Sequence, residues 1–467
     1  MKIYNTLTRM KEELIPLIEG EVKIYACGPT VYNYIHIGNA RPICVFDILR
    51  RYLEFRGYKV TFVQNFTDID DKIINKANAE NTDYLTISER YIEEYKKDAV
   101  GLNVLAADIH PRATENMDEI IEIISKLIEN GHAYATETGD VYFRTKSFDE
   151  YGKLSKQPLD DLESGARISV DEIKENPLDF ALWKSAKPGE PMWEAPWGKG
   201  RPGWHIECSA MARRYLGETI DIHCGGQDLI FPHHENEIAQ SECCNNAAFA
   251  KYWMHNGYIN VDNKKMSKSL GNFFTVRDVA EQFGYEPIKY MLISSHYRSP
   301  INYNTEIITA CKASLERLYN CRENLDFALQ NAIDDVGADD ESSKTQLNLH
   351  REHFITAMDD DLNTADALSS IFELTREINS LLADGKASKN LITFAISLFD
   401  ELTDVLGIVQ NKKKDSLSEE IEALIEKRTE ARKNKDWALA DEIRDELKAR
   451  HVILEDTPQG IKWRIES

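Results

Sequence analysis

The feature that most restricts the fold of this chain is an alternation of strand-like and helix-like segments over its first 130 residues. Residues 22–27 and 59–66 are rich in apolar, β-branched and aromatic side chains, as buried strands are. Between them, apolar side chains from Ile43 to Leu53 recur at helical spacing, and Pro42 suits the first turn of a helix. This βαβα order predicts an α/β fold with a parallel sheet, which binds ligands at its carboxyl edge.

The rest of the chain divides by pattern into an insertion, a second α/β stretch and a helical end. Residues 140–204 interrupt the alternation with a hairpin-like strand and the stretch KPGEPMWEAPWGKGRPGW, and long irregular segments of this kind are commonly functional. The α/β pattern then resumes, and after residue 300 helices alone follow, as in a bundle. A polar linker, QNKKKDSLSEE, precedes a helix pair and two short strands around the turn TPQG.

Length and composition indicate a large cytosolic protein. A chain of 467 residues is too long for one core, so we expect about three domains. No run approaches the ~18 apolar residues of a membrane span, and the N-terminus has no apolar signal region, so we expect a cytoplasmic protein without a membrane partner. The eight cysteines form no CxxC pair and no disulfide framework. The net charge of −23 disfavours a generic nucleic-acid binder, because such proteins usually present a basic surface.

The tetrapeptide HIGN, residues 36–39, lies where the first strand gives way to the helix. Unpaired N–H groups and the helix dipole favour anions there, and His36 adds a hydrogen-bond donor. Gly38 lets a flat ring approach the backbone closely. The same residues also suit an ordinary polar helix cap with a surface histidine, so the motif alone does not separate the two.

A second motif, KKMSKSLGN at residues 264–272, is basic and rich in small hydroxyl side chains. Lys265 and Lys268 are interleaved with Ser267 and Ser269. Such a loop can fold over a triphosphate and supply ammonium charge to the leaving pyrophosphate. A solvated basic turn would have the same composition, so this motif too is ambiguous by itself.

In this order, HIGN near the first strand and KMSKS after the last resemble the paired motifs of class I aminoacyl-tRNA synthetases. Further stretches narrow the resemblance to the cysteinyl-tRNA synthetase family: YACGPTVYNYIHIGNARP, NFTDIDDKIINKA, PGWHIECSAM, DIHCGGQDLIFPHHENEIAQSE, NKKMSKSLGNF and LEDTPQGIKWR. The similarity runs from about residue 3 to the end of the chain. One position departs, because the class I motif usually ends in a second histidine and this chain has Asn39. An asparagine donates a hydrogen bond but carries no titratable proton, which puts an acid role there in doubt.

The resemblance implies a Rossmann-like parallel-sheet catalytic domain with an insertion, followed by an α-helical bundle and a small α+β C-terminal domain. We expect the first catalytic half at residues 1–120, a connective insertion at 121–203 and the second catalytic half at 204–262. The KMSKS loop and a stem-contact region would occupy residues 263–305, the helical bundle 306–410 and an anticodon-binding domain 411–467.

The segment FPHHENE suggests part of a metal site. His233 and Glu237 stand at i and i+4, close enough on one helical face to share an ion, and this geometry favours His233 over His234. The sequence alone brings no cysteine to them, and core or capping roles stay open for these residues. The resemblance implies one zinc ion per chain, bound by residues that match Cys27, Cys208, His233 and Glu237. Cys224 is a competitor that only its position in the motif excludes.

The implied zinc ion has a role in selecting the substrate. Cysteine differs from serine by one atom, and a pocket that only fits the side chain would discriminate by ~1–3 kcal/mol. Zinc binds a deprotonated thiol far better than a hydroxyl, and coordination lowers the thiol pKa. An open coordination position would therefore accept the substrate sulfur. Mg²⁺ is expected only as the partner of ATP.

Other stretches of the family's site are expected to contact the substrates. By resemblance, Trp204 lines the amino-acid pocket with Thr67 and His205 as neighbours, although Trp204 equally suits the core of the insertion. The GGQD stretch resembles the one that approaches the ATP ribose, where Gly226 leaves room and Asp228 accepts a hydroxyl hydrogen bond. A tight turn with a capping aspartate is the alternative for GGQD.

The reaction that the resemblance implies has two steps. Cysteine and Mg-ATP yield cysteinyl-adenylate and pyrophosphate, and the terminal ribose hydroxyl of tRNA(Cys) then takes the cysteinyl group. Positioning and charge stabilisation carry the first step, which needs no protein nucleophile. His36 and Asn39 are expected at the phosphates and Gly38 at the ATP, with Lys268 as the main transition-state cation and Lys265 in support.

The C-terminal segment, by the same resemblance, reads the anticodon. Trp437 and Trp463 suit stacking on unpaired bases, although both could be core residues in so small a domain. One rival function is a ligase that joins cysteine to an amino sugar, and the intact C-terminal segment argues against it. The other rival is an inactive tRNA-binding paralogue, which predicts damage to KMSKS or to the metal set. The expected partners are therefore tRNA(Cys), ATP and L-cysteine, and no feature demands more than a monomer.

Overall fold

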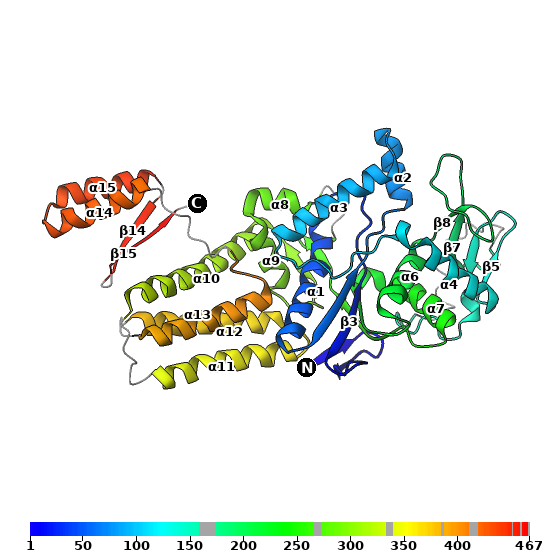
Figure 1. Cartoon of the computed structure of the whole chain (residues 1–467), viewed down its shortest axis with the longest axis horizontal. Coiled ribbons are helices and arrows are strands. Elements are labelled where there is room, and N and C mark those ends of the chain that lie inside the picture. The colour runs from blue at the N-terminus through cyan, green and yellow to red at the C-terminus, as the bar shows by residue number, and fades with distance from the viewer. Residues whose placement is uncertain are drawn as a thin grey trace. The chain divides into compact units, whose positions relative to one another are not determined.

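The computed structural model describes residues 1–157, 174–265, 272–332, 340–383, 387–410, 419–450, 452–457 and 460–465 (Figure 1). The chain forms two compact units. The first comprises Met1–Ala313, Ile355–Leu368 and Val405–Ile408, and the second comprises Ser314–Phe354, Ser369–Asp404 and Val409–Ser467.

A four-stranded parallel sheet with the order β10-β9-β3-β4 forms the centre of the first unit. Its strands are β3 (Glu21–Ala26), β4 (Lys59–Gln64), β9 (Ile220–Gly226) and β10 (Ala250–Asn256). The chain moves outward from β3 to β4 in the first half and outward from β9 to β10 in the second, so the strand order reverses between β3 and β9. Ligands of open parallel sheets bind in the crevice at such a reversal. The predicted α/β fold with a parallel sheet is confirmed.

Helices join and cover these strands. The first half carries α1 (Ile37–Phe55), α2 (Asp71–Glu80) and α3 (Tyr84–Gly101), and the second half carries α6 (Trp204–Leu216) and α7 (Glu235–Asn245). Helix α4 (Met117–Glu129) leads from the first half into the insertion. Apolar side chains of the strands and of α6 and α7 share one buried cluster, which includes Tyr25, Val63, Met211, Ile238 and Trp253. This packing fixes α6 and α7 against the sheet, next to the strand ends.

The insertion contains its own antiparallel sheet, with the order β5-β6-β7-β8. The strands are β5 (Ala133–Ala135), β6 (Val141–Phe143), β7 (Phe180–Ser185) and β8 (Gly200–Pro202). The hairpin-like strand predicted in this part of the sequence is therefore confirmed. The sheet ends where α6 begins, so it delivers Trp204 to the first turn of that helix.

Smaller elements complete the first unit. An N-terminal hairpin pairs β1 (Lys2–Asn5) with β2 (Met10–Glu13), and a three-stranded sheet joins β11 (Ile259–Val261), β12 (Lys264–Lys265) and β13 (Ile301–Tyr303). Between β12 and β13 lie α8 (Val276–Phe283) and α9 (Tyr285–Ile293). The backbone N–H of Ile37 donates to the carbonyl of Phe274, so the chain after KMSKS lies beside the start of α1.

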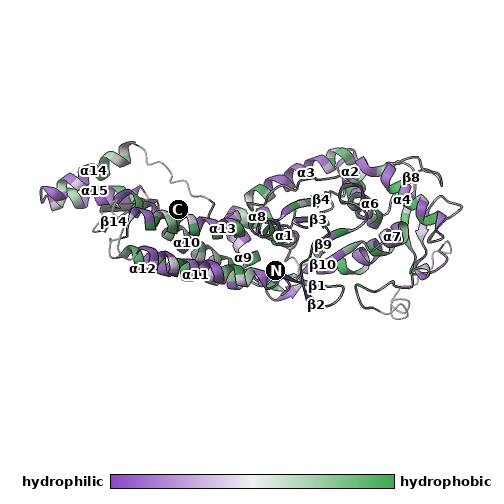
Figure 2. Ribbon diagram, turned by 60° about the horizontal axis from the view of Figure 1, so that its bottom comes forward, coloured by the Kyte–Doolittle hydropathy of each residue, from purple (hydrophilic) through white to green (hydrophobic). Residues whose placement is uncertain are grey.

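Four helices form the predicted bundle: α10 (Thr305–Asn331), α11 (Asp340–Asp359), α12 (Thr364–Ala383) and α13 (Lys389–Leu406). Polar side chains link them, as in the Arg322–Asp400 and Arg351–Glu401 ion pairs. Apolar residues of the bundle are buried between the helices, among them Leu318, Leu325, Leu347, Phe354, Leu374 and Phe399. In Figure 2 these helices carry apolar and polar residues along their whole length, as amphipathic helices do.

The C-terminal end is a helix pair followed by a hairpin, as the sequence predicts. Helices α14 (Glu419–Lys433) and α15 (Trp437–Ala449) precede the antiparallel strands β14 (Val452–Thr457) and β15 (Gly460–Ile465). Ile443, Leu447 and Val452 are buried in its small core. Trp437 is 58% exposed at the start of α15, which contradicts a core role for this side chain. The side chain of Trp463 lies outside the described residues.

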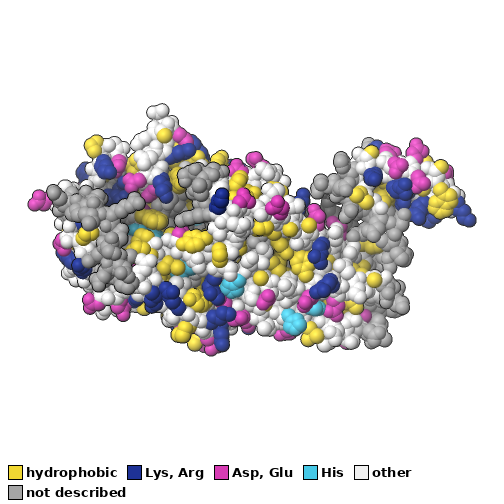
Figure 3. Space-filling model, turned by 180° about the vertical axis from the view of Figure 1, so that it is seen from behind, with side chains coloured by type: hydrophobic (Ala, Val, Ile, Leu, Met, Phe, Trp, Pro, Cys, Tyr) yellow, Lys and Arg dark blue, Asp and Glu magenta, His cyan; other side chains and the backbone are white. Residues whose placement is uncertain are grey.

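Two surface properties bear on function. No described helix is long and apolar enough to cross a membrane. On the face shown in Figure 3, Lys and Arg side chains are interspersed with Asp and Glu, although the net charge of the chain is −23. The excess of acidic residues therefore does not exclude basic side chains from this face.

Candidate active site and metal-ligand cluster

A cavity of about 750 Å³ opens at the carboxyl ends of the parallel strands. Its wall is built by segments that follow β3, β9 and β10 and by the start of α1. The predicted site residues that line it are Cys27, His36, Gly38, Asn39, Trp204, Gly226 and Asp228. Trp204 is 41% exposed and belongs to this wall, so its alternative role in the core of the insertion is wrong.

His36 and Asn39 form a reciprocal cap at the start of α1. Nδ1 of His36 accepts the Asn39 backbone N–H at 3.1 Å, and Oδ1 of Asn39 accepts the His36 backbone N–H at 3.3 Å. This is a capping box, which satisfies two backbone donors at once. Because Nδ1 of His36 is an acceptor, the neutral ring carries its proton on Nε2. The cap and a ligand-binding role are therefore compatible, since each side chain keeps donor atoms besides the capping acceptor.

The four predicted metal ligands lie together. Their ligand atoms are all within 4.8 Å of one another, although they come from the end of β3, from α6 and from the start of α7. Sγ of Cys27 lies 3.8 Å from Sγ of Cys208 and 3.4 Å from Oε1 of Glu237. Nε2 of His233 lies 3.0 Å from the same Oε1. His233 sits in the turn before α7 rather than within that helix, but the turn keeps it beside Glu237.

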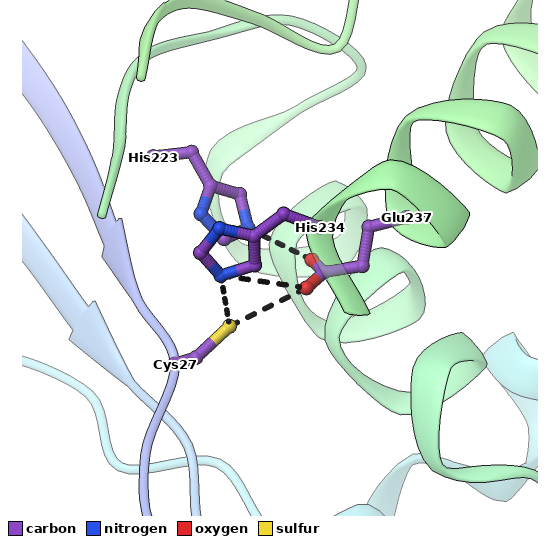
Figure 4. Close-up of side chains that lie close together, drawn as sticks. All are labelled: Cys27, His223, His234 and Glu237. Atoms are coloured by element: carbon purple, nitrogen blue, oxygen red, sulfur yellow. Dashed lines mark hydrogen bonds and ion pairs between the residues drawn. The ribbon is translucent and has the colours of Figure 1, made fainter. Parts of the chain in front are cut away.

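A second group of four residues also has its ligand atoms within 4.8 Å of one another, and it shares two members with the first group. It consists of Cys27, His223, His234 and Glu237 (Figure 4). Nε2 of His234 lies 3.4 Å from Sγ of Cys27, and Nε2 of His223 lies 2.8 Å from Oε2 of Glu237. The i,i+4 argument therefore does not remove His234 from the neighbourhood of the metal ligands. Cys224 belongs to neither group, and its side chain donates to the Tyr25 carbonyl.

Electrostatics prepare this cluster for a cation. The hydrogen bond from Cys27 lowers the pKa of Cys208 to about 6, although burial opposes the shift. Burial would lower the pKa of His233, but the Glu237 carboxylate and Cys208 raise it to about 10. Burial also disfavours the charge on Glu237, yet His223 and His233 hold the pKa of its carboxyl well below the usual range. Burial raises the pKa of Cys27 well above its usual value, so the negative charge of the cluster lies on Cys208 and Glu237, beside a protonated His233.

Two further histidines are held neutral by their surroundings. Burial lowers the pKa of His234 well below its usual value and that of His255 to about 3. Nδ1 of His234 lies 2.8 Å from Nε2 of His255, whose Nδ1 lies 2.8 Å from the Thr6 hydroxyl. Both ring nitrogens of His234 and both of His255 have a polar partner, and these contacts fix the orientation of the two rings.

The predicted neighbours of the amino-acid pocket take supporting positions. The Thr67 hydroxyl donates to Oε2 of Glu207 at 3.0 Å, within the buried region under the cavity. Nδ1 of His205 lies 2.8 Å from Nδ1 of His233, and Trp204 stacks near the His233 ring with centroids 4.3 Å apart. His205 and Trp204 therefore contact the metal ligand His233, whereas Thr67 contacts Glu207. Of the three predicted residues, Trp204 lines the cavity.

Glycines at the strand ends leave room that a side chain would fill. A Cβ atom on Gly28 would lie 1.6 Å from the backbone oxygen of Asn65, whose Oδ1 accepts the Gly28 N–H at 2.9 Å. A Cβ atom on Gly226 would lie 2.3 Å from Oδ1 of Asp228. The missing side chains therefore let the chain after β3 lie against Asn65 and let the Asp228 side chain lie against Gly226.

Parts of the prediction fall on residues that the structure does not describe. Lys268 lies outside the described residues, and Lys265 is described only as a residue of β12, where it pairs with Asn260. The sequence reasoning also missed three residues of the site, namely Asn65, His223 and His255. Asn65 directly follows β4, His255 is the penultimate residue of β10 and His223 lies midway along β9, so the signal for the first two was their place at the carboxyl ends of strands, where parallel sheets bind ligands.

Comparisons with known proteins agree with this geometry. Three family descriptions match the chain: tRNA synthetases class I (C) catalytic domain over residues 13–313, DALR domain over 353–410, and cysteinyl-tRNA ligase anticodon binding domain over 414–464. A cysteine–tRNA ligase of Clostridioides difficile (strain 630) is 56% identical over 465 residues, which are 99% of this chain and 100% of that relative.

Solved structures of other synthetases share the fold. A Mycobacterium tuberculosis methionyl-tRNA synthetase in complex with methionyl-adenylate has a TM-score of 0.60 at 16% identity, over 83% of this chain and 89% of that one. An Agrobacterium radiobacter K84 LeuRS in a ternary complex with tRNA has a TM-score of 0.59 at 12% identity, over 85% of each chain. At these identities the likeness concerns the fold alone, whereas the full-length relative and the matched domains identify the family. The chain belongs to the cysteine–tRNA ligase family of class I aminoacyl-tRNA synthetases.

Proposed function

We propose that this chain activates L-cysteine with ATP and transfers the cysteinyl group to the 3′ end of tRNA(Cys). The observation that carries the proposal is a cavity at the reversal of the sheet that is lined both by the start of α1 and by Cys27, a member of the metal-ligand cluster. The cysteine carboxylate attacks the α-phosphate, pyrophosphate leaves, and the adenylate then passes its acyl group to a ribose hydroxyl. Both steps depend on orientation and charge stabilisation.

At the phosphates, the start of α1 supplies the donors. We assign the ring of His36 and the side-chain amide of Asn39 to the phosphates, because both residues line the cavity and both side chains carry N–H groups. Together with the helix N-terminus they suit an anion. Gly38, Gly226 and Asp228 line the same cavity, and we assign Asp228 to the ribose hydroxyls.

We assign Lys268 as the main cation of the transition state and Lys265 as its support, on the KMSKS resemblance. Mg²⁺ enters with the ATP. Loss of the ammonium group in Lys268→Ala should slow adenylate formation by roughly 100-fold or more, the scale of removing one electrostatic donor from an active site. An unchanged rate would remove Lys268 from this role.

We further propose a zinc ion, one per chain, held by Cys27, Cys208, His233 and Glu237. The donor set fits, because zinc favours thiolate and imidazole ligands in a buried place. Ligand histidines normally have a partner on the second ring nitrogen, and Nδ1 of His233 has one in His205. His223 faces the cluster through Nε2, and its Nδ1 is buried without a hydrogen-bond partner among the described residues, so His223 lacks the supporting partner that ligand histidines normally have.

Zinc bound there would supply a coordination position that takes a thiolate in preference to a hydroxyl. The residues of this chain then have separate tasks. Cys208 offers a sulfur with a depressed pKa, His205 and His223 orient His233 and Glu237, and Trp204 closes the cavity wall above them. This division of tasks supports selection of cysteine over serine by the bound metal.

The C-terminal segment is proposed to bind the anticodon of tRNA(Cys). The exposed indole of Trp437 supports this assignment, since aromatic faces stack on unpaired bases. The domain boundaries stated for the sequence remain our proposal for how tRNA contacts are divided along the chain. We propose a monomer as the working unit, because no feature of the sequence demands a second subunit.

ATP–pyrophosphate exchange with cysteine and with serine, followed by charging of total tRNA, tests the proposal. We expect exchange with cysteine, little with serine, and a cysteine label on tRNA. Exchange without charging, together with product formation on an amino sugar, would favour the amino-sugar ligase. Absence of exchange in metal-loaded protein would favour the inactive tRNA-binding paralogue.

A further inference from the structure

A second cluster of side chains that could bind a metal lies in the helical bundle. Its residues belong to the second compact unit, whereas those that line the cavity belong to the first. The cluster joins α11 and α12. His350 and His353 stand at i and i+3 on α11, and Glu373 and Glu377 stand at i and i+4 on α12. Residues at these spacings lie on one face of a helix. The two helices thus present two imidazoles and two carboxylates to each other.

The donor atoms are close enough to share one ion. One ring nitrogen of His350, one of His353 and one carboxylate oxygen of Glu373 all lie within 4.8 Å of one another. The centroids of the two imidazole rings are 6.3 Å apart, and the ring planes are nearly perpendicular, at 78°. An ion bound by these three donors would need metal–nitrogen and metal–oxygen distances of ~2.0–2.2 Å, so the side chains would have to turn toward it on binding.

Glu377 fixes the His350 ring in the way that carboxylates fix metal-bound histidines. Nε2 of His350 lies 2.5 Å from Oε2 of Glu377. Nδ1 of His350 is buried and has no hydrogen-bond partner among the described residues. A ring whose one nitrogen donates to a carboxylate has a lone pair on the other, and this pairing raises its basicity as a ligand. An unsatisfied buried nitrogen costs about 1–3 kcal/mol, which ligation would offset.

The competing interaction within the cluster is weak. Nη2 of Arg376 lies 3.7 Å from Oε1 of Glu373, and the two side chains are 70% and 48% exposed. Exposed ion pairs of this kind contribute little. Glu373 and His353 therefore have exposed donors that an ion can recruit from solvent.

We propose that His350, His353 and Glu373 form a site for a divalent transition-metal ion that ties α11 to α12, with Glu377 as the residue that positions His350. Two imidazoles and one carboxylate suit Zn²⁺ or Ni²⁺, whereas Mg²⁺ and Ca²⁺ prefer oxygen ligands alone. The site is independent of the proposed zinc in the catalytic unit, which has sulfur ligands. A bound ion links two helices at their surface and stabilises the folded bundle by mass action.

Calorimetric titration of the zinc-loaded full chain with Ni²⁺, and separately with further Zn²⁺, tests the proposal. We expect one additional saturable site per chain. The exposed positions give variants that do not disturb packing, and His353→Gln and Glu373→Gln should each abolish the saturable phase. Glu377→Gln should weaken it about 10–100-fold, as loss of a supporting carboxylate does. Glu316→Gln, an exposed carboxylate on α10, is the matched control and should titrate as the wild type does.

Co²⁺ separates the two sites by spectroscopy. The catalytic cluster should show thiolate-to-cobalt charge transfer, whereas the bundle site, which has no sulfur ligand, should add only ligand-field bands. His353→Gln should lose those bands and keep full ATP–pyrophosphate exchange. Two results would overturn the proposal: no additional binding by the zinc-loaded wild type, or undiminished binding by both His353→Gln and Glu373→Gln.

Discussion

Oε2 of Glu237 lies 2.8 Å from Nε2 of His223, and both side chains are fully buried. The other oxygen, Oε1, faces Cys27 at 3.4 Å and His233 at 3.0 Å. The carboxylate is therefore divided between a supporting histidine and the proposed metal ligands. This division gives His223 an orienting role and explains why a histidine belongs in the buried strand β9.

Removal of His223 should weaken the metal site without removing a ligand. We expect His223→Ala to lower zinc affinity about 10–100-fold, because Glu237 loses the partner that orients it. His223→Gln, which keeps an N–H donor, should recover part of the loss. Zinc competition with a chelator measures both.

Cys208→Ser is the comparison for this experiment, because it removes a proposed ligand. It should reduce zinc content far more than His223→Ala does. The opposite order, with zinc retained in Cys208→Ser and lost in His223→Ala, would assign the metal to the group drawn in Figure 4.

Asn39 has two roles, one in capping α1 and a proposed one in binding the phosphates, and two substitutions distinguish them. Asn39→Ala removes the oxygen that accepts the His36 N–H, which should cost about 1 kcal/mol of unfolding free energy, and it also removes the amide donor. Asn39→Asp keeps the acceptor but loses the donor and adds negative charge near the phosphates. Adenylate formation should therefore fall in both variants, while only Asn39→Ala loses stability. Urea unfolding and pyrophosphate exchange distinguish these outcomes, and normal exchange by Asn39→Asp would contradict the phosphate role.

Substitutions at two glycines should have different consequences. In Gly28→Ala the new Cβ would meet the backbone oxygen of Asn65, so the strand ends must shift, at about 1–3 kcal/mol of stability. In Gly226→Ala the new Cβ would meet the end of the Asp228 side chain, which can rotate away. We expect a lower Tm for Gly28→Ala, and for Gly226→Ala a raised KM for ATP with little change in Tm. Equal loss of stability in both would contradict this account.

His110 should contribute to the loss of stability in acid. Its Nε2 accepts the Ala107 N–H and its Nδ1 bonds to the Gln64 carbonyl, so the ring is neutral, and burial lowers its pKa. The unfolded chain takes up this proton near pH ~6.5, whereas the folded protein takes it up only at lower pH. Stability from this group is therefore present above about pH 6.5 and falls as the pH decreases below it.

Urea unfolding at about pH 7.5 and about pH 5.5, on either side of the ordinary histidine pKa, measures the effect. When the pH is lowered from the higher to the lower value, the free energy of unfolding should fall less for His110→Gln than for the wild type. Because the other histidines are present in both proteins, the difference reports on His110, and identical pH profiles would argue against its contribution.

Trp437 should contribute to the affinity for tRNA(Cys) and not to the formation of cysteinyl-adenylate. Stacking of one base on an aromatic side chain is worth about 1–3 kcal/mol, so Trp437→Ala should weaken tRNA(Cys) binding roughly tenfold or more. Trp437→Phe keeps an aromatic face and should bind more tightly than the alanine variant. Filter binding measures the affinity, and ATP–pyrophosphate exchange is the control that should not change. Unaltered binding by Trp437→Ala would remove this residue from the tRNA interface.

Local patterns of the sequence were enough to predict the architecture. The alternation of residues 22–66 predicts β3, α1 and β4 because hydrophobic periodicity and turn residues act within a few positions. The hairpin strand of the insertion, the bundle helices and the final helix pair with its hairpin follow from the same local signals. The resemblance to the cysteinyl-tRNA synthetase family then indicated which residues to expect in the active site and in the metal-ligand cluster.

The amino-acid sequence by itself determined the parallel sheet, the helix that begins at HIGN and the family. Only the tertiary structure decided which side chains meet: Cys27 and Cys208 are 181 residues apart in sequence, and their sulfurs lie 3.8 Å apart because β3 and α6 pack together. It also showed that HIGN is a capping box as well as a wall of the cavity, and that His223 supports Glu237. Contacts of this kind depend on packing between distant segments, which no local periodicity encodes.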